Sequence, residues 1–281
     1  MGFAAPTNKN LVYASVAAGI IFIFALTSQH SSHAQKLTSA ISDAAAHTLP
    51  VSWSANKKPV NEPTWHEVAI HHNTDKVNPH SYQDMYDKYL PALRHKKIKM
   101  LEIGLGCDMG YGPGHSYYTW LDYFTDVDLY FMEYNAACAE AWANTTTGAT
   151  VVTGDQGDPN VLQSFIVEHG TDFDIIIDDG GHTMQQQMLS LQILWQAIRP
   201  GGIYFCEDLE TSWIPVYGGN SIVSEGAAEN TMLKMIHRLI EDMTYPEDNA
   251  NWPRQVYFRD VEKLVHIDCS RQVCAFEKRH A

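Results

Sequence analysis

Two acidic clusters, each directly after an apolar run, contain the residues of this sequence best suited to chemistry. Residues 175–182 read Ile-Ile-Ile-Asp-Asp-Gly-Gly-His, and residues 203–208 read Ile-Tyr-Phe-Cys-Glu-Asp. If both apolar runs are neighbouring strands of a parallel sheet, their acidic ends open on the same edge, where α/β sheets bind ligands. Four carboxylates and an imidazole at that edge suit a divalent cation together with a general base.

Strand and helix patterns alternate from about residue 80 onward. The expected strands are 98–103, 127–133, 150–153, 173–178, 203–206, 264–267 and 273–276. The expected helices are 81–93, 116–124, 136–143, 160–169, 184–195 and 232–243, with residues 199–202 as a loop. This order predicts an α/β fold with a doubly wound, mostly parallel Rossmann-like sheet and an antiparallel C-terminal hairpin.

The first expected strand runs directly into a glycine-rich loop. Gly104 and Gly106 would let the backbone approach a ligand closely. Glu133 ends the next strand, where an acid can accept hydrogen bonds from both hydroxyls of a ribose. Asp155 follows the third strand, in position to meet an adenine amine. These positions predict a site for a nucleoside-containing cofactor.

Two cofactors compete for this site. A dinucleotide fold prefers a Gly-x-Gly-x-x-Gly loop that opens a helix. Here the third glycine, Gly110, is one position late, and the loop runs on to Gly114. Glu102 stands two residues before the first glycine, where an acid suits a ligand with a positive charge and an ammonium group. S-adenosylmethionine has both, so methyl transfer is favoured over hydride transfer.

Taken together, these motifs resemble the class I S-adenosylmethionine-dependent methyltransferases. More narrowly, they resemble the metal-dependent sugar O-methyltransferases of the macrocin and mycinamicin type, over roughly residues 70–278. The residues that carry the resemblance are Leu101–Gly106 with the long loop to Ser116, Thr74-Asp75-Lys76 with His80, Tyr82 and Tyr86, Asp178–His182, and Glu207-Asp208 with Thr211–Trp213 and Tyr217–Gly219. The family often has serine where this chain has Gly181.

The resemblance implies a magnesium ion bound by Asp179, Glu207 and Asp208, with His182 as the general base. Magnesium held by two substrate oxygens lowers the pKa of the acceptor hydroxyl, and the histidine takes its proton. The cofactor contacts that we expect are Glu102, Gly104, Gly106, Ser116, Glu133, Asp155 and Asp178. For Asp178 an alternative is open, namely that it caps the following helix.

The expected function is magnesium-assisted O-methylation of a hydroxyl on a sugar, glycoside or small metabolite. Two alternatives stay open: a nonenzymatic binding module that keeps the cofactor fold, and a nicotinamide-dependent reductase. The related enzymes carry an N-terminal region that helps assemble the oligomer and cover the site, and here that region is short. Their substrate and oligomeric state therefore do not carry over, and a homo-oligomer stays open.

The amino-terminal part differs from the rest of the chain. Residues 11–26 carry no charge, and Thr27 and Ser28 extend this stretch to eighteen residues, near the lower limit for a spanning helix. We therefore expect a tail at 1–10, a membrane segment at 11–28, a linker at 29–63 and the methyltransferase domain at 64–281. An anchor implies a single-pass endomembrane protein. Ser32-His33-Ala34 resembles a signal-peptide cleavage site, which would instead imply secretion.

Composition limits the partners. The formal net charge of −14 argues against nonspecific binding of nucleic acid and favours small neutral or cationic ligands. The five cysteines are scattered without a CxxC pair, so neither a zinc ribbon nor a disulfide scaffold is indicated. Cys269 and Cys274 flank the expected hairpin turn, and both a disulfide and two free thiols stay open for them.

Overall fold

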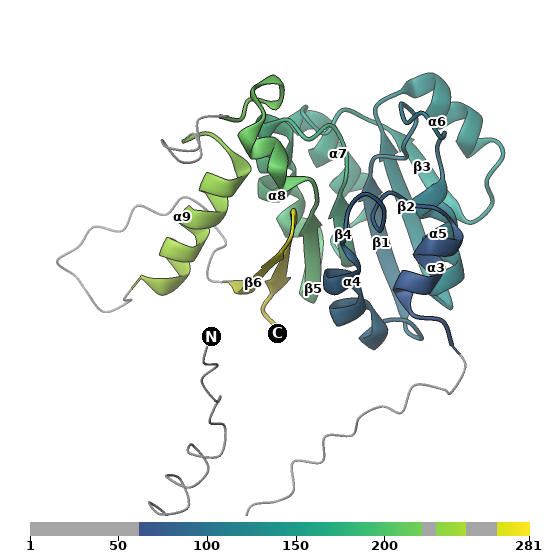
Figure 1. Ribbon diagram of the computed structural model, residues 1–281, viewed down its shortest axis with the longest axis horizontal. Helices are drawn as coiled ribbons and strands as arrows, with labels where there is room; N and C mark the ends of the chain where they lie inside the picture. Colours follow the sequence, from purple (N-terminus) through teal and green to yellow (C-terminus); the bar gives the residue numbers. More distant parts are fainter. Residues whose placement is uncertain (1–61, 221–228, 246–262) are drawn as a thin grey trace, which may run out of the picture. The chain divides into compact units, whose positions relative to one another are not determined.

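A mixed sheet forms the centre of the computed structural model, which describes residues 62–220, 229–245 and 263–281 (Figure 1). Its strand order is β3-β2-β1-β4-β5-β7-β6. The strands are β1 (Lys97–Ile103), β2 (Asp126–Glu133), β3 (Ala149–Thr153), β4 (Phe173–Asp178), β5 (Ile198–Cys206), β6 (Leu264–Ser270) and β7 (Val273–Lys278). Neighbours among β1–β5 pair in parallel, whereas β7 pairs antiparallel with both β5 and β6. The predicted Rossmann-like sheet with an antiparallel C-terminal hairpin is confirmed.

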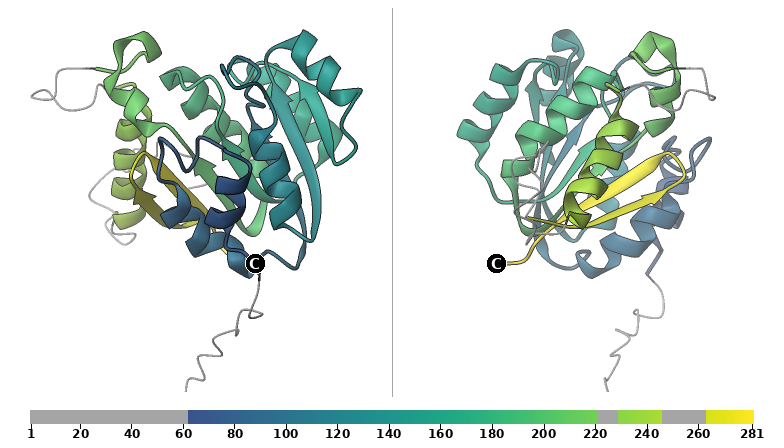
Figure 2. Two further views of the ribbon diagram at one scale, coloured as in Figure 1. Left: turned by 45° about the vertical axis from the view of Figure 1, so that its right-hand side comes forward. Right: turned by 90° about the vertical axis from the view of Figure 1, so that its left-hand side faces the viewer.

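Helices cover both faces of this sheet (Figures 1 and 2). The helices are α3 (Trp65–His71), α4 (Gln83–Tyr89), α5 (His115–Tyr123), α6 (Ala136–Ala143), α7 (Pro159–His169), α8 (Met184–Leu194) and α9 (Met232–Thr244). The 3-10 turns are η1 (Leu90–Ala92), η2 (Trp195–Ala197), η3 (Leu209–Trp213) and η4 (Pro215–Tyr217). Side chains of α3, α4 and α5 pack on one face of the sheet, and those of α7, α8 and α9 pack on the other.

Local capping chemistry explains where several helices begin. Thr183 caps α8 by accepting a hydrogen bond from the Gln186 N–H, and the Gln186 side chain returns to the Thr183 backbone. Asn135 caps α6 and Asp158 caps α7 in the same way, through their side-chain oxygens. The alternative that Asp178 caps the helix after β4 is therefore wrong, because Thr183 has that role.

Two elements differ from their predictions. The stretch Arg199–Gly202, expected as a loop, belongs to β5, and the pairing register with β4 shifts between Phe173 and Ile175. A bulge of this kind lets a strand accommodate Pro-Gly-Gly without ending the sheet. The short helix α3 was not predicted, although Thr64 and Glu67 form a capping box at its start.

The expected membrane segment, residues 11–28, lies outside the described residues. Within the part of the chain that the structure describes, no helix combines the length and apolar character that crossing a bilayer requires. The two cysteines that flank the hairpin turn, Cys269 and Cys274, form a disulfide. Of the two alternatives for this pair, a disulfide and two free thiols, the structure shows the disulfide.

Candidate functional site

The pleat of the central strands decides where the acids point. Successive residues of a strand face opposite sides of a sheet. Asp178 follows Ile176 on the face covered by α8, whereas Glu102 follows Met100 on the face covered by α3, α4 and α5. Asp179 lies just past β4, and its backbone N–H still donates to Ile103. The acids at this edge of the sheet therefore separate into two groups.

Lys76 gathers the first group. Its ammonium lies 2.5 Å from Asp179 Oδ2, 2.6 Å from Glu207 Oε2 and 3.0 Å from Glu102 Oε1. The Lys76 side chain is 1% exposed. Burial alone lowers the pKa of Lys76, but the charges of Asp179, Glu207 and Glu102 outweigh burial and raise this pKa well above its usual value. The lysine is thus a buried cation shared by three carboxylates.

Glu102 and Glu207 lie beneath the cavity of the site and do not line it. The indole N–H of Trp120 donates to Glu102 Oε2 at 2.6 Å, and the hydroxyl of Tyr86 donates to Glu207 Oε1. Burial raises the pKa of Glu207, since one ammonium cannot compensate the charge of three buried carboxylates. In this arrangement both acids interact with protein groups rather than with the cavity.

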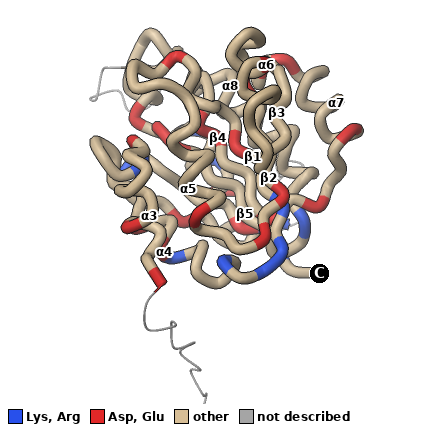
Figure 3. Tube along the Cα trace, turned by 90° about the vertical axis from the view of Figure 1, so that its right-hand side faces the viewer, with Lys and Arg blue, Asp and Glu red and all other residues tan. Residues whose placement is uncertain are grey.

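Above this cluster lies a cavity of about 500 Å³. Its lining residues lie at the carboxyl ends of the parallel strands. Acidic positions occur near the ends of β1 and β4, as well as elsewhere on the molecule (Figure 3). The expected site residues that line it are Gly104, Gly106, Ser116, Glu133, Asp155, Asp179, His182 and Asp208. The fold therefore brings together eight of the eleven residues selected from the sequence, while Glu102, Asp178 and Glu207 lie below the surface of the cavity.

Three of the lining residues are close enough to share a metal ion. One ligand atom each of Asp179, His182 and Asp208 lies within 4.8 Å of the other two. His182 Nε2 is 3.1 Å from Asp208 Oδ2, and the hydroxyl of Tyr82 donates to Asp208 Oδ1 at 2.6 Å. The two carboxylates fit a hard divalent cation such as magnesium, because its preferred ligands are oxygens, and the imidazole stands beside them as a candidate proton acceptor.

The backbone holds His182 and Asp208 in an uncommon conformation. Their φ angles are +58° and +54°, in the left-handed region that residues with a side chain rarely adopt. The His182 Nδ1 atom is buried and has no hydrogen-bond partner among the described residues. Strain of this kind persists where the surrounding structure fixes it, and it clusters at functional sites. It makes this pair a candidate for a functional role at this edge of the sheet.

The acid at the end of β2 connects two loops. Glu133 accepts hydrogen bonds from the backbone N–H of Leu105 at 3.0 Å and of Asn135 at 2.8 Å. A carboxylate offers about four acceptor positions, so Glu133 can still accept from ribose hydroxyls in the cavity. Asp155 accepts from the backbone N–H of Gly157 at 2.7 Å and lines the same cavity. Both acids are placed to meet a nucleoside.

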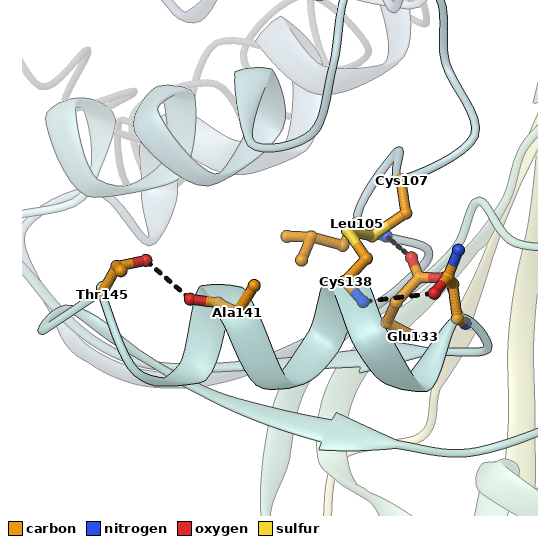
Figure 4. Close-up of a disulfide and its surroundings, with 7 residues drawn as sticks. Leu105, Cys107, Glu133, Cys138, Ala141 and Thr145 are labelled. Atoms are coloured by element: carbon orange, nitrogen blue, oxygen red, sulfur yellow. Dashed lines mark hydrogen bonds between the residues drawn. A yellow bond between two sulfur atoms is a disulfide. The ribbon is translucent and has the colours of Figure 1, made fainter.

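A disulfide fixes the glycine-rich loop beside Glu133. Cys107, in that loop, pairs with Cys138 of α6, with their Cα atoms 6.1 Å apart (Figure 4). Cys107 itself lines the cavity. The absence of a CxxC pattern therefore did not reveal this disulfide. No local pattern indicates this pair, because the two cysteines are 31 residues apart and meet only when β1 and β2 lie side by side.

Asp178 takes a supporting position behind the cavity. Its carboxylate accepts hydrogen bonds from Gln156 Nε2 at 2.8 Å and from the Tyr204 hydroxyl at 3.0 Å. Burial raises the pKa of Asp178 to about 6 despite these two bonds. Gln156 Oε1 in turn accepts from the backbone N–H of Gly181 at 2.7 Å. Asp178 thus orients the residue that holds the loop carrying His182.

Several residues of the site were missed or given no role from the sequence alone. Lys76, Tyr82 and Tyr86 belong to the motif before the first strand, but nothing in their spacing assigned them to the acids. No sequence pattern identified Gln156 as a site residue, because it lies in a loop between a strand and a helix. Their roles depend on which elements pack against the sheet.

No protein-family model matches the chain. Among curated proteins, a tetracenomycin-C 3'-O-methyltransferase of Streptomyces olivaceus that acts on a 2-methoxy-rhamnosyl derivative is 31% identical over 218 residues, which are 75% of this chain and 53% of that protein. Demethylmacrocin O-methyltransferase of Streptomyces fradiae is 30% identical over 200 residues, which are 68% of this chain and 48% of that enzyme. The chain spans about half the length of these curated relatives.

A solved structure has the same fold. The MycE methyltransferase from the mycinamycin biosynthetic pathway, in complex with Mg and SAH, superposes with a TM-score of 0.66 at 26% identity. The match covers 78% of this chain and 54% of that one. Sequence and fold comparisons agree: the chain is similar to the macrocin- and mycinamicin-type sugar O-methyltransferases.

Proposed function

We propose that this protein transfers a methyl group from S-adenosylmethionine to a hydroxyl of a sugar, glycoside or small secondary metabolite, with magnesium bound at the site. The observation that carries the proposal is one cavity lined both by Glu133 and the glycine-rich loop and by Asp179, His182 and Asp208. The first group suits the nucleoside of the donor, and the second suits a cation and a proton acceptor.

The donor half of the site would lie along the ends of β1, β2 and β3. Gly104 permits the close backbone approach, because a side chain there would collide with the Asp179 carbonyl. Glu133 and Asp155 would accept hydrogen bonds from the ribose and the adenine. Ser116 lines the far end of the loop, at the start of α5, and completes this half.

The acceptor half would lie at the ends of β4 and β5. When bound, the donor supplies an electrophilic methyl group, and magnesium at Asp179 and Asp208 lowers the pKa of an acceptor hydroxyl. Glu207, the third ligand implied by the resemblance, lies beneath them with its carboxylate on Lys76 and Tyr86. Methyl transfer would break the carbon–sulfur bond of the donor, which leaves as a neutral thioether, and form the carbon–oxygen bond. His182 would take the hydroxyl proton, and Asp208 beside its ring would stabilise the resulting imidazolium.

Calorimetry on the full chain tests this function directly. S-adenosylmethionine is titrated with and without magnesium into the wild type and into Asp179→Ala. We expect donor binding in both proteins, and magnesium binding that Asp179→Ala abolishes. A folded wild type that does not bind the donor contradicts the proposal, and donor binding without any metal binding removes the magnesium step.

Labelled methyl transfer to a panel of methyl glycosides then tests the chemistry. We expect turnover that a chelator stops. In His182→Gln the rate should fall by about 100-fold or more, the usual contribution of a general base, with the donor affinity unchanged. Turnover by His182→Gln at the wild-type rate would remove the histidine from the proposed mechanism.

A further inference from the structure

The position of Lys76 suggests a role beyond those of the residues considered above. We propose that Lys76 is a positioning residue that orients Asp179 from below so that this carboxylate binds a divalent cation in the cavity. The inference rests on the proposed function, since it concerns the metal half of the same site.

The first step is geometric. Of the three carboxylates on the Lys76 ammonium, only Asp179 lines the cavity, with a side chain that is 23% exposed. The other two, Glu102 and Glu207, are fully buried and hold the ammonium from the protein side. Lys76 contacts Asp179 through Oδ2, which leaves Oδ1 as the oxygen for another ligand. The ammonium is therefore placed to set the direction of one metal-binding oxygen.

The second step is the rigidity of the lysine itself. The backbone N–H of Tyr82 donates to the Lys76 carbonyl at 2.9 Å. The same Tyr82 donates through its hydroxyl to Asp208, the second cavity acid. One short segment between α3 and α4 thus fixes both acids, Asp179 through Lys76 and Asp208 through Tyr82. The contacts of Lys76 with Asp179 and of Tyr82 with Asp208 restrict the rotation of both carboxylates.

The third step is charge. One ammonium faces three carboxylates, so the formal charges leave this group short of positive charge, and Asp208 adds a further acid at the cavity wall. Lys76 therefore orders the acids without neutralising them. A divalent cation bound by Asp179 and Asp208 would compensate most of the remaining charge, as buried charges require.

Calorimetric titration of Mg²⁺ and of S-adenosylhomocysteine into the full chain tests the role of Lys76. In Lys76→Met we expect Mg²⁺ to bind at least about tenfold more weakly, since Asp179 loses the ammonium that orients it, and this loss outweighs the removal of a nearby positive charge. The affinity for S-adenosylhomocysteine should change little, because Glu133 and Asp155 contact neither Lys76 nor its partners. A purely structural loss would weaken both ligands together.

Lys278→Met is the matched control. Lys278 is also buried, but its ammonium donates to the carbonyls of Trp195 at 2.9 Å and Ile198 at 2.7 Å, near the start of β5 and away from the cavity. This variant should keep both affinities. If Lys76→Met does not fold, the double variant Lys76→Met/Glu102→Gln removes one buried acid with the ammonium and keeps every cavity-lining residue.

The possible results separate this inference from the proposed function. Weaker Mg²⁺ binding with S-adenosylhomocysteine binding retained supports the positioning role. Unchanged or tighter Mg²⁺ binding in Lys76→Met overturns it, as does an equal loss of both ligands. A wild type that binds S-adenosylhomocysteine but no Mg²⁺ overturns the metal site and this role together, and a wild type that binds neither overturns the proposed function itself.

Discussion

A buried acid behind the candidate site should make the stability of this protein depend on pH. The pKa of Asp178 rises from 3.8 to about 6 because the carboxylate is buried. Since its folded-state pKa lies above its unfolded value, the native state binds the proton more tightly. The charged form therefore costs about 3 kcal/mol above pH 6, and this cost disappears as the pH falls from 6 to below 4.

Comparison with Asp178→Asn isolates the contribution of Asp178 to the pH dependence of stability. Urea unfolding of both proteins between pH 4 and pH 7.5 gives the difference in their free energies of unfolding. We expect the wild type to gain about 2–3 kcal/mol relative to the variant as the pH falls through this range. A difference that stays constant with pH would show that Asp178 is not the buried titrating group.

At the scale of elements, the loop after β1 must pass very close to the loop after β4. Gly104 has a φ of +97°, and a Cβ there would lie 2.0 Å from the Asp179 carbonyl oxygen. Gly104→Ala should therefore destabilise the fold by about 3 kcal/mol or more and abolish donor binding. Thermal unfolding and donor titration measure the two effects.

The variant Gly112→Ala separates the cost of a positive φ angle from the cost of a steric collision. Gly112 also has a positive φ, +88°, but nothing lies within 4 Å of the added Cβ. This variant should lose only about 1–2 kcal/mol, the usual cost of a left-handed conformation with a side chain. Equal losses in both variants would mean that the contact with Asp179 is not what requires glycine at 104.

The disulfide between the glycine-rich loop and α6 should preorganise the donor half of the site. Replacing Cys107 and Cys138 together by alanine removes a cross-link between residues 31 positions apart in the sequence. The loss should destabilise the protein by about 3 kcal/mol. Without this tie the free loop gains freedom, so S-adenosylhomocysteine should bind about tenfold more weakly.

The second disulfide supplies the comparison. The disulfide between Cys269 and Cys274 links residues with a sequence separation of only 5, and neither cysteine lines the cavity. Replacing this pair by alanine should leave donor affinity unchanged. If both double variants bind S-adenosylhomocysteine like the wild type, the loop does not depend on its covalent tie.

At the scale of the whole molecule, the described lining of the cavity comes from one unit. The lining residues that the structure describes all belong to the unit from Glu62 to Ala281. A fragment of residues 62–281 should therefore fold cooperatively and bind S-adenosylmethionine with the affinity of the full chain. Circular dichroism and calorimetry on both proteins check this, and a fragment that folds but does not bind would place part of the donor site in residues 1–61.

Membrane attachment is the property that residues 11–28 are expected to add. Cell fractionation of the full chain and of the same fragment tests it. We expect the full chain in the membrane fraction and the fragment outside it, and recovery of both proteins in the same fraction would contradict an anchor.

The sequence by itself determined the type of fold and the edge that carries the site. Alternating apolar strands and amphipathic helices specify a parallel sheet, because hydrophobic period and chain order are local properties. The positions of Gly104, Glu133, Asp179 and His182 at strand ends followed from the same patterns, since carboxyl ends of parallel strands share one edge.

Only the tertiary structure decided which acids face the cavity. Glu207 and Asp208 are neighbours in sequence, yet Glu207 bonds to Lys76 beneath the site and Asp208 lines the cavity beside His182. The cation that gathers the acids, Lys76, lies more than a hundred residues before Asp179 along the chain. No local pattern encodes such contacts, because they depend on which helices pack on each face of the sheet.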